Sequence, residues 1–419
     1  MKQKSAEILC IGTELLMGNT VNTNATYIAK GLAQNGVNVF HQAVVGDNPQ
    51  RLKESLDLAF SRSDIVITTG GLGPTYDDLS KETIAAWFGK ELVLHEDSLR
   101  HIEDFFRRLG REMTDNNRKQ AMMPQDCTIF PNPNGTAPGC AIEKDGKVAF
   151  MLPGPPREMR PMFDNYVIPY LQKDSDTVLV SKMIHLFGIG ESMLEHKLHD
   201  VMVESSNPTL APYAKEGEVQ LRVTARVHRD EDAEAILQPM MDKVSEIAGE
   251  FIYGIDIGDL QTAAVTRLKE KGLHVATAES CTGGYVSKRL VDVDGVSEVF
   301  DCGVCSYSND IKEKVLGVSH DTLVAYGAVS EQTAREMAAG VRRLSGAEIG
   351  VSTTGIAGPG GGTPEKPVGL VYVAVDSDKY SEVLKLQIPS RSDDAREYIR
   401  YIASSNALHL IWKAAGFFD

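Results

Sequence analysis

The sequence has 419 residues, of which 42% are apolar, and its formal net charge at pH 7 is −15. This length predicts two to four domains. The acidic balance argues against broad binding to nucleic acid or to anionic membrane surfaces, so direct nucleic-acid binding is not expected. Six cysteines are too few for a disulfide scaffold of this size. No signal peptide and no apolar run of the ~18 residues that a membrane span needs are recognised, and we expect a cytoplasmic protein without membrane contact.

The first block, residues 1–171, alternates strand and helix patterns. Short apolar strands alternate with helices of period 3.6 over Ser5–Gly12, Asn22–Asn35, Val37–Val45, Gln50–Ser61 and Ile65–Thr69. Such alternation predicts a parallel sheet with helices on its faces. Ligands of sheets of this kind bind at the carboxyl ends of the strands.

Loops at these strand ends combine glycines with carboxylates. Gly71 and Gly73 precede Asp78, while Glu14 and Asp47 follow two other strands. Glycines let backbone amides approach phosphate oxygens, and carboxylates can hold a hard cation that bridges those oxygens. The pattern favours phosphate and metal chemistry. The alternative is that one aspartate of the glycine loop only caps the helix that follows.

The second block, residues 172–252, has the texture of a small α+β module. Its strand and helix patterns cover Thr177–Phe187, Glu191–Val203, Pro208–Tyr213, Glu218–Val227 and Glu231–Ala248. Gly188 to Gly190 is interpreted as a tight strand-to-helix turn, with a phosphate loop as the alternative. Residues 249–258 are predicted to link this module to the third block.

The third block, residues 253–419, returns to an α/β pattern. The expected elements are Asp259–Lys271, Leu273–Ala276, Tyr285–Leu290, Glu298–Tyr307, Ile311–Leu316, Glu331–Leu344, Glu348–Thr353 and Val368–Val375. A loop rich in glycine, Thr354 to Pro364, lies between the last two strands. Its composition permits close approach to a ligand, but it also suits an inert connector.

Ser280 follows a short apolar strand and precedes a helix in this block. Backbone amides at such a turn, here those of Thr282 and Gly283, can bind an oxyanion that develops on a substrate. Serine needs a nearby base, and Lys312 can act as one if it is partly desolvated. The alternatives are a plain turn, a solvated lysine, and Cys281 as the nucleophile.

Two further groups of side chains have open roles. Cys302 and Cys305 form a CxxC pair without the second pair that a metal site usually needs. Arg391, Arg396 and Arg400 stand near the start of the last expected helix. One of these arginines can clamp a phosphate, although solvated arginines on a helix are common.

These motifs resemble those of the CinA family of competence/damage-inducible proteins over essentially the whole chain. The amino-terminal half carries Gly12 to Leu16, Asn19 to Asn24, Thr69 to Asp78 and Leu152 to Met159. The carboxyl half carries Ala278 to Gly284, Tyr307 to Asn309, Gly327 to Ser330 and Gly355 to Pro359. That half is similar to nicotinamide mononucleotide amidohydrolases of the PncC type.

The resemblance implies an α/β protein of three parts. A three-layer amino-terminal domain with the molybdopterin-binding fold of MogA and MoeA is followed by a small KH-like α+β module and an α/β amidase domain. The first domain is expected to cleave ADP-ribose with a divalent metal ion. The last is expected to deamidate nicotinamide mononucleotide to nicotinate mononucleotide and ammonia. The implied protein is a bifunctional hydrolase of the pyridine nucleotide cycle, acting on small nucleotides and expected as a homodimer.

The resemblance also implies roles for individual residues. The family's nucleophile, lysine and tyrosine fall on Ser280, Lys312 and Tyr307. Substrate contacts are expected from Thr282, Gly283, Thr354, Gly355, Arg391, Arg396, Gly71, Gly73 and Asn24. Asp47, Asp78 and Glu14 are the expected ligands of Mg²⁺ or a similar divalent ion, and Asp78 is also expected to be catalytic. K⁺ is a further candidate at the metal-dependent site, and the deamidase is expected to need no cofactor.

Two other functions remain open. The amino-terminal domain would bind or adenylylate molybdopterin if the fold analogy alone decided its activity. The chain would instead be a non-catalytic partner in DNA uptake if the family's name described its role. The net charge of −15 speaks against direct contact with DNA.

Overall fold

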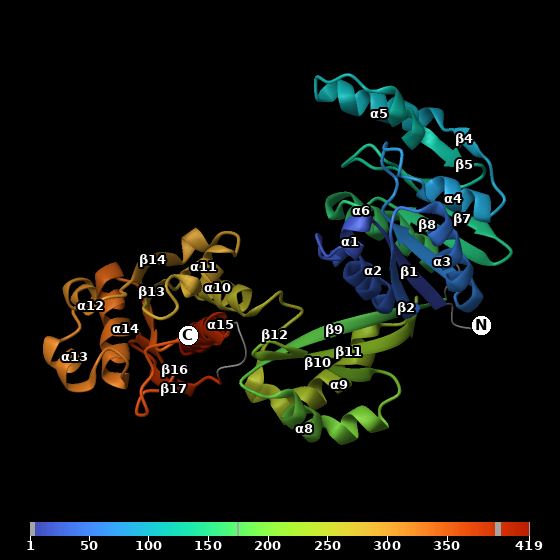
Figure 1. Cartoon of the computed structure of the whole chain (residues 1–419). Coiled ribbons are helices and arrows are strands. Elements are labelled where there is room, and N and C mark those ends of the chain that lie inside the picture. The colour runs from blue at the N-terminus through green and yellow to red at the C-terminus, as the bar shows by residue number, and fades with distance from the viewer. Residues whose placement is uncertain (1–4, 174–175, 390–394, 419) are drawn as a thin grey trace. The chain divides into compact units, whose positions relative to one another are not determined.

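The computed structural model describes residues 5–173, 176–389 and 395–418 (Figure 1). The chain divides into two compact units. The first comprises residues 1–181 and 225–236, and the second comprises residues 182–224 and 237–419. In the described part of the chain, no helix is both long and apolar enough to cross a membrane.

A six-stranded sheet forms the centre of the first unit, in the order β2-β1-β3-β8-β7-β6. Its strands are β1 (Ser5–Ile11), β2 (Asn38–Val45), β3 (Ile65–Thr69), β6 (Thr128–Phe130), β7 (Gly139–Lys144) and β8 (Lys147–Leu152). The first four strands of this order are parallel, and β7 and β6 add an antiparallel edge. The carboxyl ends of four neighbouring strands therefore meet at one end of the sheet.

Helices cover both faces of this sheet. One face carries α2 (Thr23–Gln34), α6 (Pro156–Met162), η2 (Phe163–Val167) and α7 (Ile168–Gln172), and the other carries α3 (Pro49–Arg62) and α4 (Ser80–Trp87). Strand β1 shows the cause, because successive side chains point to opposite faces. Ile8 packs in the cluster of the first face, and Leu9 packs in the cluster of the second. The predicted three-layer arrangement is confirmed.

A segment without any predicted element leaves the sheet between α4 and β6. It contains β4 (Leu92–Leu94), α5 (Glu96–Arg108), η1 (Asp115–Ala121) and β5 (Met122–Pro124). Strands β4 and β5 pair with each other, and Leu99, Ile102 and Ala121 form a small apolar cluster beside them. The short helix α1 (Thr13–Leu16) directly follows β1.

The KH-like module is a four-stranded sheet of order β10-β11-β9-β12 with two helices. Its elements are β9 (Thr177–Phe187), α8 (Glu191–Glu204), β10 (Thr209–Lys215), β11 (Glu218–His228), α9 (Ala233–Ala248), η3 (Gly249–Phe251) and β12 (Ile252–Ile255). The prediction of a linker over residues 249–258 is therefore wrong in its first part. Strand β12 pairs antiparallel with β9, and Tyr253 is buried in an apolar cluster.

The last part of the chain contains a five-stranded sheet of order β14-β13-β15-β16-β17. Its strands are β13 (Val275–Glu279), β14 (Phe300–Cys305), β15 (Ile349–Gly355), β16 (Leu370–Ser377) and β17 (Ser381–Gln387). The first three of this order are parallel, and β16 and β17 are antiparallel. The predicted α/β class of this region is confirmed.

Two sets of helices cover this sheet. Val275 packs in the cluster formed with α10 (Leu260–Lys271), α11 (Tyr285–Val291) and α15 (Ala395–Ala415). The next residue, Ala276, packs in the cluster formed with α12 (Asn309–Leu316), α13 (His320–Tyr326) and α14 (Glu331–Ser345). A short 3-10 turn, η4 (Val296–Glu298), precedes β14. Ser280 therefore emerges from the middle of a sheet that is buried on both faces.

Candidate functional site

Ser280 and Lys312, the predicted nucleophile and base, lie next to each other. Ser280 is the first residue after β13, and Lys312 lies near the start of α12, which Ser308 caps. The Nζ atom of Lys312 lies 3.2 Å from Ser280 Oγ. Lys312 is 1% exposed and Ser280 is 9% exposed. The alternative of a solvated lysine is therefore wrong.

The surroundings of Lys312 lower its pKa. Its Nζ atom also donates to the backbone oxygens of Ser306, at 2.7 Å, and Tyr307, at 3.4 Å. Burial lowers the pKa of Lys312, and the neighbouring Cys281 opposes that shift only in part. No carboxylate of the described residues forms an ion pair with Lys312. A lysine in such a place can lose its proton closer to neutral pH than an exposed one.

The cysteines of this region are poorer candidates for a nucleophile or a metal site. Cys281 is buried, and burial raises the pKa of its thiol to about 12. The thiol therefore stays protonated at neutral pH and is a poor nucleophile. Cys302 and Cys305 are free thiols on β14. Among the residues that the structure describes, no three histidine, cysteine or acidic side chains come together as a metal site.

Glu279, for which no role was predicted, forms hydrogen bonds that hold the turn after Ser280. Its carboxylate accepts backbone N–H groups from Gly284, Val286 and Ser287 at 2.9, 3.0 and 2.8 Å. These three amides are therefore not available to a substrate oxyanion. The predicted oxyanion donors, the amides of Thr282 and Gly283, precede them in the same turn.

The hydroxyls of Thr282 and Thr354 are engaged inside the protein. Thr282 Oγ1 lies 2.6 Å from Glu279 Oε2 and 2.7 Å from Thr353 Oγ1. Thr354 Oγ1 donates to the backbone oxygen of Ala328 at 2.7 Å. Both threonines are buried. Contacts with a substrate from these two residues would therefore have to come from their backbone.

Tyr307 and Arg396 lie at the rim of this site. The Tyr307 ring is exposed, and its hydroxyl accepts a hydrogen bond from Arg396 Nη2 at 3.4 Å. Arg396 Nη1 donates to Gly358 O at 2.5 Å and so connects α15 to the glycine-rich loop. Gly355 ends β15, and a Cβ atom there would lie 2.7 Å from a backbone oxygen of β16. Arg391 lies outside the described residues.

In the first unit, the predicted phosphate- and metal-binding residues line one cavity. It has a volume of about 370 Å³, and its lining includes Glu14, Asp47, Gly71, Gly73 and Asp78. These residues follow β1, β2 and β3, which places the cavity at the carboxyl ends of the parallel strands. Polar residues without a predicted role also line it, namely Gln120, Thr136 and Glu158.

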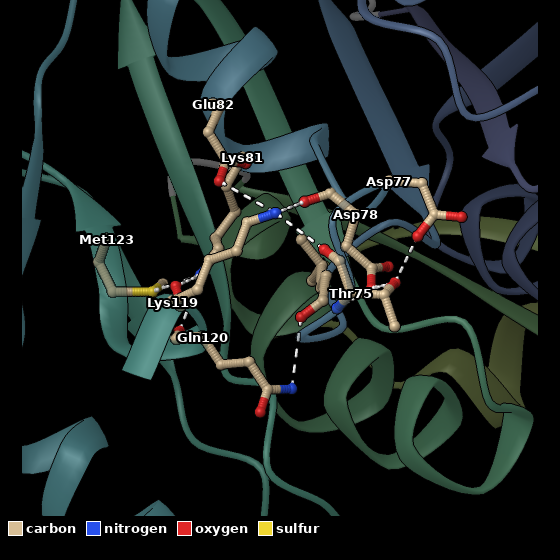
Figure 2. A network of polar contacts seen from close by, with 9 residues as sticks. Thr75, Asp77, Asp78, Lys81, Glu82, Lys119, Gln120 and Met123 are labelled. Carbon is tan, nitrogen blue, oxygen red and sulfur yellow. Dashed lines mark hydrogen bonds and ion pairs between the residues drawn. The ribbon is translucent and has the colours of Figure 1, made fainter. Parts of the chain in front are cut away.

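Asp78 forms hydrogen bonds within the glycine loop, residues 70–78, which connects β3 to α4 (Figure 2). Its Oδ2 atom accepts hydrogen bonds from Thr75 N, at 2.9 Å, and from Thr75 Oγ1. Thr75 Oγ1 also lies 2.5 Å from Asp77 Oδ1, and this hydrogen bond lowers the pKa of Asp77. Helix α4 has Leu79 as its N-cap residue and no side-chain cap. The alternative that an aspartate only caps this helix is therefore wrong.

Two lysines connect η1 to its neighbours, Lys119 to this loop and Lys81 to α4 (Figure 2). Lys119 Nζ donates to the backbone oxygens of Thr75, at 3.1 Å, and Asp78. Lys81 is 2% exposed and donates to the backbone oxygens of Lys119, at 3.1 Å, and Gln120, at 2.8 Å. Burial lowers the pKa of Lys81 to about 8. Neither lysine was predicted to have a role.

Asp47 and Asn24 hold neighbouring parts of the cavity wall. Asp47 Oδ2 accepts from Thr13 N and Thr13 Oγ1, both at 2.8 Å. Asn24 is buried and donates from Nδ2 to Thr69 Oγ1 at 2.9 Å and Gly154 O at 2.7 Å. Asn24 is not among the residues that line the cavity, so its place in the structure is behind the predicted site.

The expected ligands Glu14, Asp47 and Asp78 line one cavity but do not come together as a three-ligand metal site in the described part of the chain, so a divalent ion there would have to be shared with a substrate. The Oδ1 atoms of Asp47 and Asp78 take no part in the loop hydrogen bonds described above. Glu14 lies on the same cavity wall as an exposed side chain. Mg²⁺ typically takes one or two protein carboxylates and completes its shell with waters and substrate phosphates.

Family profiles match all three parts of the chain. The "CinA C-terminal domain" profile covers residues 258–415, and the "Probable molybdopterin binding domain" profile covers residues 7–173. The "Damage-inducible protein CinA KH domain" profile covers residues 181–254. Together they describe a molybdopterin-binding-like domain, a KH domain and a CinA carboxyl-terminal domain in one chain.

Relatives align with nearly the whole chain. A competence-damage inducible protein of Clostridium acetobutylicum is 51% identical over 94% of this chain and 96% of its own. A CinA-like protein of Kosmotoga olearia is 49% identical over 98% of both chains. The chain therefore belongs to the CinA family, and the resemblance seen in the sequence is confirmed.

Solved structures of relatives cover a smaller part of the chain. The competence/damage inducible protein CihA of Agrobacterium tumefaciens is 41% identical and covers 38% of this chain and 96% of its own, with a TM-score of 0.36. The CinA protein of Thermoplasma acidophilum is 36% identical and covers 39% of this chain and 96% of its own, with a TM-score of 0.37.

Proposed function

We propose that the second unit hydrolyses the carboxamide of nicotinamide mononucleotide to give nicotinate mononucleotide and ammonia. The observation that carries this proposal is the Ser280 hydroxyl 3.2 Å from the buried amine of Lys312. Amide hydrolysis needs a nucleophile, a base that later protonates the leaving nitrogen, and donors for the oxyanion. The substrate itself follows from the resemblance to nicotinamide mononucleotide amidohydrolases.

In this proposal the neutral amine of Lys312 removes the proton of Ser280 Oγ while Oγ attacks the carboxamide carbon. The resulting oxyanion is held by the amides of Thr282 and Gly283. The ammonium of Lys312 then gives the proton to the departing nitrogen, which leaves as ammonia, and an ester on Ser280 remains. Water attacks this ester with Lys312 again as the base, which frees the carboxylate and restores the hydroxyl.

Basic residues near α15 support a phosphorylated substrate. Arg396 reaches the glycine-rich loop through Gly358 O, and Arg400 donates to Thr282 O at 2.7 Å. Arg400 therefore lies beside the turn that carries Ser280, and Arg396 lies beside the glycine-rich loop and Tyr307. Arginine binds phosphate oxygens through paired N–H groups, and we propose that Arg396, together with Arg391, meets the 5′-phosphate.

The direct test is ammonia release by the purified protein from nicotinamide mononucleotide. We expect steady ammonia production that a chelator does not reduce, because the proposed steps use only side-chain and backbone groups. Nicotinamide riboside, which lacks the phosphate, serves as the comparison substrate. The absence of ammonia from a folded, full-length protein would overturn the proposal.

The nucleophile has a separate test. We expect Ser280→Ala to lower ammonia release on the order of 10³-fold or more, because the covalent route is lost. Lys312→Ala should fall nearly as far, since nucleophile and base act as a unit. Cys281→Ala is the matched control and should retain most of the activity, because its thiol is protonated and buried. A Ser280→Ala variant with more than about a tenth of the activity would favour a directly activated water.

We further propose that the first unit cleaves the pyrophosphate of ADP-ribose with a bound divalent ion. Its cavity is lined by five carboxylates, Glu14, Asp47, Asp77, Asp78 and Glu158, and by no lysine or arginine of the described residues. Such a lining repels a naked pyrophosphate, so a cation has to accompany the substrate. Asp47 and Asp78 are the groups proposed to hold the ion, which would neutralise phosphate charge when bound.

AMP formation from ADP-ribose tests this second activity. We expect AMP in the presence of Mg²⁺, its loss on addition of a chelator, and its loss in Asp78→Ala with ammonia release intact. Adenylyl transfer from ATP to molybdopterin is measured in parallel, because this reaction is the alternative for the same fold. Transfer without ADP-ribose cleavage would replace the proposed activity by the alternative.

A further inference from the structure

Glu279 is a buried carboxylate surrounded only by hydrogen-bond donors. It is 1% exposed and ends β13, one residue before Ser280. Its two oxygens accept five hydrogen bonds, from Thr282 Oγ1, Gly284 N, Val286 N, Ser287 N and Ser287 Oγ, at 2.6 to 3.0 Å. In the described part of the chain, no lysine, arginine or histidine forms an ion pair with it.

A buried charge without an ionic partner costs free energy unless hydrogen bonds compensate it. Here the compensation comes from five donors, three of which are amides at the start of α11. The aligned peptide dipoles of a helix also favour a negative charge at this end. The five hydrogen bonds therefore compensate the burial of the carboxylate. A neutral side chain of the same size would leave several of these donors without an equivalent acceptor.

These bonds act on the turn on both sides of Ser280. Glu279 precedes Ser280 and is fixed within β13, while its Oε2 atom holds Thr282 and Gly284, which follow. Thr282 Oγ1 also contacts Thr353 Oγ1 at 2.7 Å, and Ser280 N donates to Thr353 O at 2.9 Å. The hydroxyl of Ser280 therefore sits in a turn that is attached at both ends to the middle of the sheet.

The local sequence explains why such attachment is needed. Gly283 and Gly284 have φ angles of +59° and +92°, a region that favours glycine. Glycine brings no side chain that could restrict the turn, so the chain itself has little stiffness there. Hydrogen bonds to a fixed carboxylate provide the restriction instead.

We propose that Glu279 is a positioning residue of the hydrolytic site, which holds Ser280 Oγ at the distance from Lys312 that proton transfer requires. This inference rests on the proposed function of the Ser280–Lys312 pair. Glu279 does not touch the reacting atoms in this account. Its charge and its five bonds set the geometry of the turn that carries the nucleophile, and small displacements of such groups are costly to catalysis.

The test compares Glu279→Gln with wild type in the full-length protein. Glutamine keeps the size of the side chain but offers one acceptor oxygen, and its NH₂ group faces N–H donors. The first readout is covalent labelling of Ser280 by an alkyl fluorophosphonate, in which Oγ displaces fluoride from phosphorus and Lys312 takes the proton. The second is kcat and KM for ammonia release.

We expect Glu279→Gln to lower the labelling rate and kcat on the order of 10- to 100-fold, the range expected for loss of hydrogen bonds to a charged group, with KM within about twofold. Thermal unfolding checks that the variant is folded. The matched control is Glu218→Gln, a second buried carboxylate of the same unit, which accepts from Tyr253 OH. It should label at the wild-type rate.

Ser287→Ala provides a milder variant in case Glu279→Gln does not fold. It removes one bond to Oε1 and leaves those to Thr282 and Gly284. We expect a labelling rate about threefold below wild type. Wild-type labelling rates in folded Glu279→Gln, or in Ser287→Ala if the first variant does not fold, would overturn the inference.

The two readouts separate this inference from the proposed function. Labelling reports on the Ser280 hydroxyl and involves no nucleotide. Wild-type protein that is labelled but releases no ammonia would refute the proposed substrate, while slower labelling of Glu279→Gln would still support the positioning role. Wild-type protein that is not labelled at all would overturn the positioning role, because there would be no activated hydroxyl to hold.

Discussion

Lys81 and Lys312 are buried amines that bind backbone carbonyls. Lys81 donates to the carbonyls of residues 119 and 120, and Lys312 donates to those of residues 306 and 307. Burial is the first cause of a lowered pKa in both. Lys312 lies beside the Ser280 hydroxyl, and the proposed mechanism uses its neutral amine. No catalytic role is proposed for Lys81, so its lowered pKa is expected to affect stability instead.

Stability of the first unit should depend on the pH through Lys81. Its pKa is about 8 in the folded protein and 10.5 ordinarily, so between these values the unfolded chain holds a proton that the folded chain has lost. The contribution of Lys81 to the free energy of unfolding therefore rises with pH. We expect wild type to gain up to about 3 kcal/mol relative to Lys81→Met between pH 8 and pH 10.5.

Denaturant unfolding of the two proteins at several pH values gives this difference directly. Groups other than Lys81 titrate in both proteins and cancel in the comparison. A difference that stays constant over this range would show that Lys81 keeps its ordinary pKa in the fold.

The sequence indicates some residues of the candidate sites better than others. Ser280 could be singled out because it follows a strand and precedes a helix. Lys312 could be paired with it only as a hypothesis, since burial decides between a base and a solvated cation. Glu279 was missed for the same reason, because a glutamate at the end of a strand looks like a surface residue until its five donors are known. Glu158 stood within a quoted motif, but only the fold turns it toward the cavity.

At the scale of elements, the glycine loop between β3 and α4 depends on tight packing. Gly71 has a φ of +66°, and a Cβ atom there would lie 1.9 Å from Ser80 Oγ. Gly110 has a similar φ of +63°, but a Cβ atom there meets nothing within 4 Å. Alanine at Gly110 should therefore cost only the backbone strain of about 1 kcal/mol.

We expect Gly71→Ala to destabilise the first unit more than Gly110→Ala, and to lower AMP formation from ADP-ribose as well. The added methyl group has to displace Ser80 at the start of α4 and moves the cavity wall with it. Thermal unfolding and AMP assays of both variants test this. Equal effects of the two substitutions would show that only backbone strain matters at Gly71.

The segment from β4 to β5 supports the glycine loop of the cavity through Lys119. This residue of η1 donates to two carbonyls of the glycine loop and pairs with Glu82 at 3.5 Å. We expect Lys119→Met to lower AMP formation about tenfold, the effect of losing hydrogen bonds to a charged group, and to leave ammonia release unchanged. Lys90→Met, which removes a pair with the exposed Asp126, is the control.

Unchanged AMP formation in Lys119→Met would mean that the loop keeps its shape without this connection. This connection was not predicted, because no element was predicted over residues 92–124. The two strands there have three residues each, too short for an alternating pattern, but the 13-residue helix α5 was missed as well. Long periodic elements such as α2, α14 and β9 were found near their observed bounds for the opposite reason.

At the scale of the whole molecule, the proposed hydrolytic site of the second unit lies entirely within the carboxyl-terminal part of the chain. Ser280, Lys312 and Glu279 all lie beyond residue 254. The apolar cluster that includes Val275 of β13 also contains Phe187 and Tyr253 of the KH-like module. The ring of Phe187 lies 4.6 Å from that of His409 in α15. The domains seen as separate blocks in the sequence thus share a core that no local pattern could reveal.

We expect a fragment of residues 254–419 to fold and release ammonia, because it retains every proposed catalytic group. Its melting temperature should lie below that of residues 182–419, which keep the two aromatic side chains in the cluster. Ammonia assays and thermal unfolding of both fragments give the answer. A folded but inactive shorter fragment would mean that the KH-like module completes the site.

The hydrogen bonds of Lys312 would also orient the lone pair of its neutral amine in the proposed mechanism. A neutral amine has two hydrogens and one lone pair. In the proposed mechanism, the carbonyls of Ser306 and Tyr307 would accept these hydrogens, and the lone pair would face Ser280 Oγ. The backbone carbonyls between β14 and α12 would therefore orient the amine of Lys312. No single side-chain substitution at Ser306 or Tyr307 removes these acceptors, whereas a change in the length of that connection would turn the lone pair away from the serine.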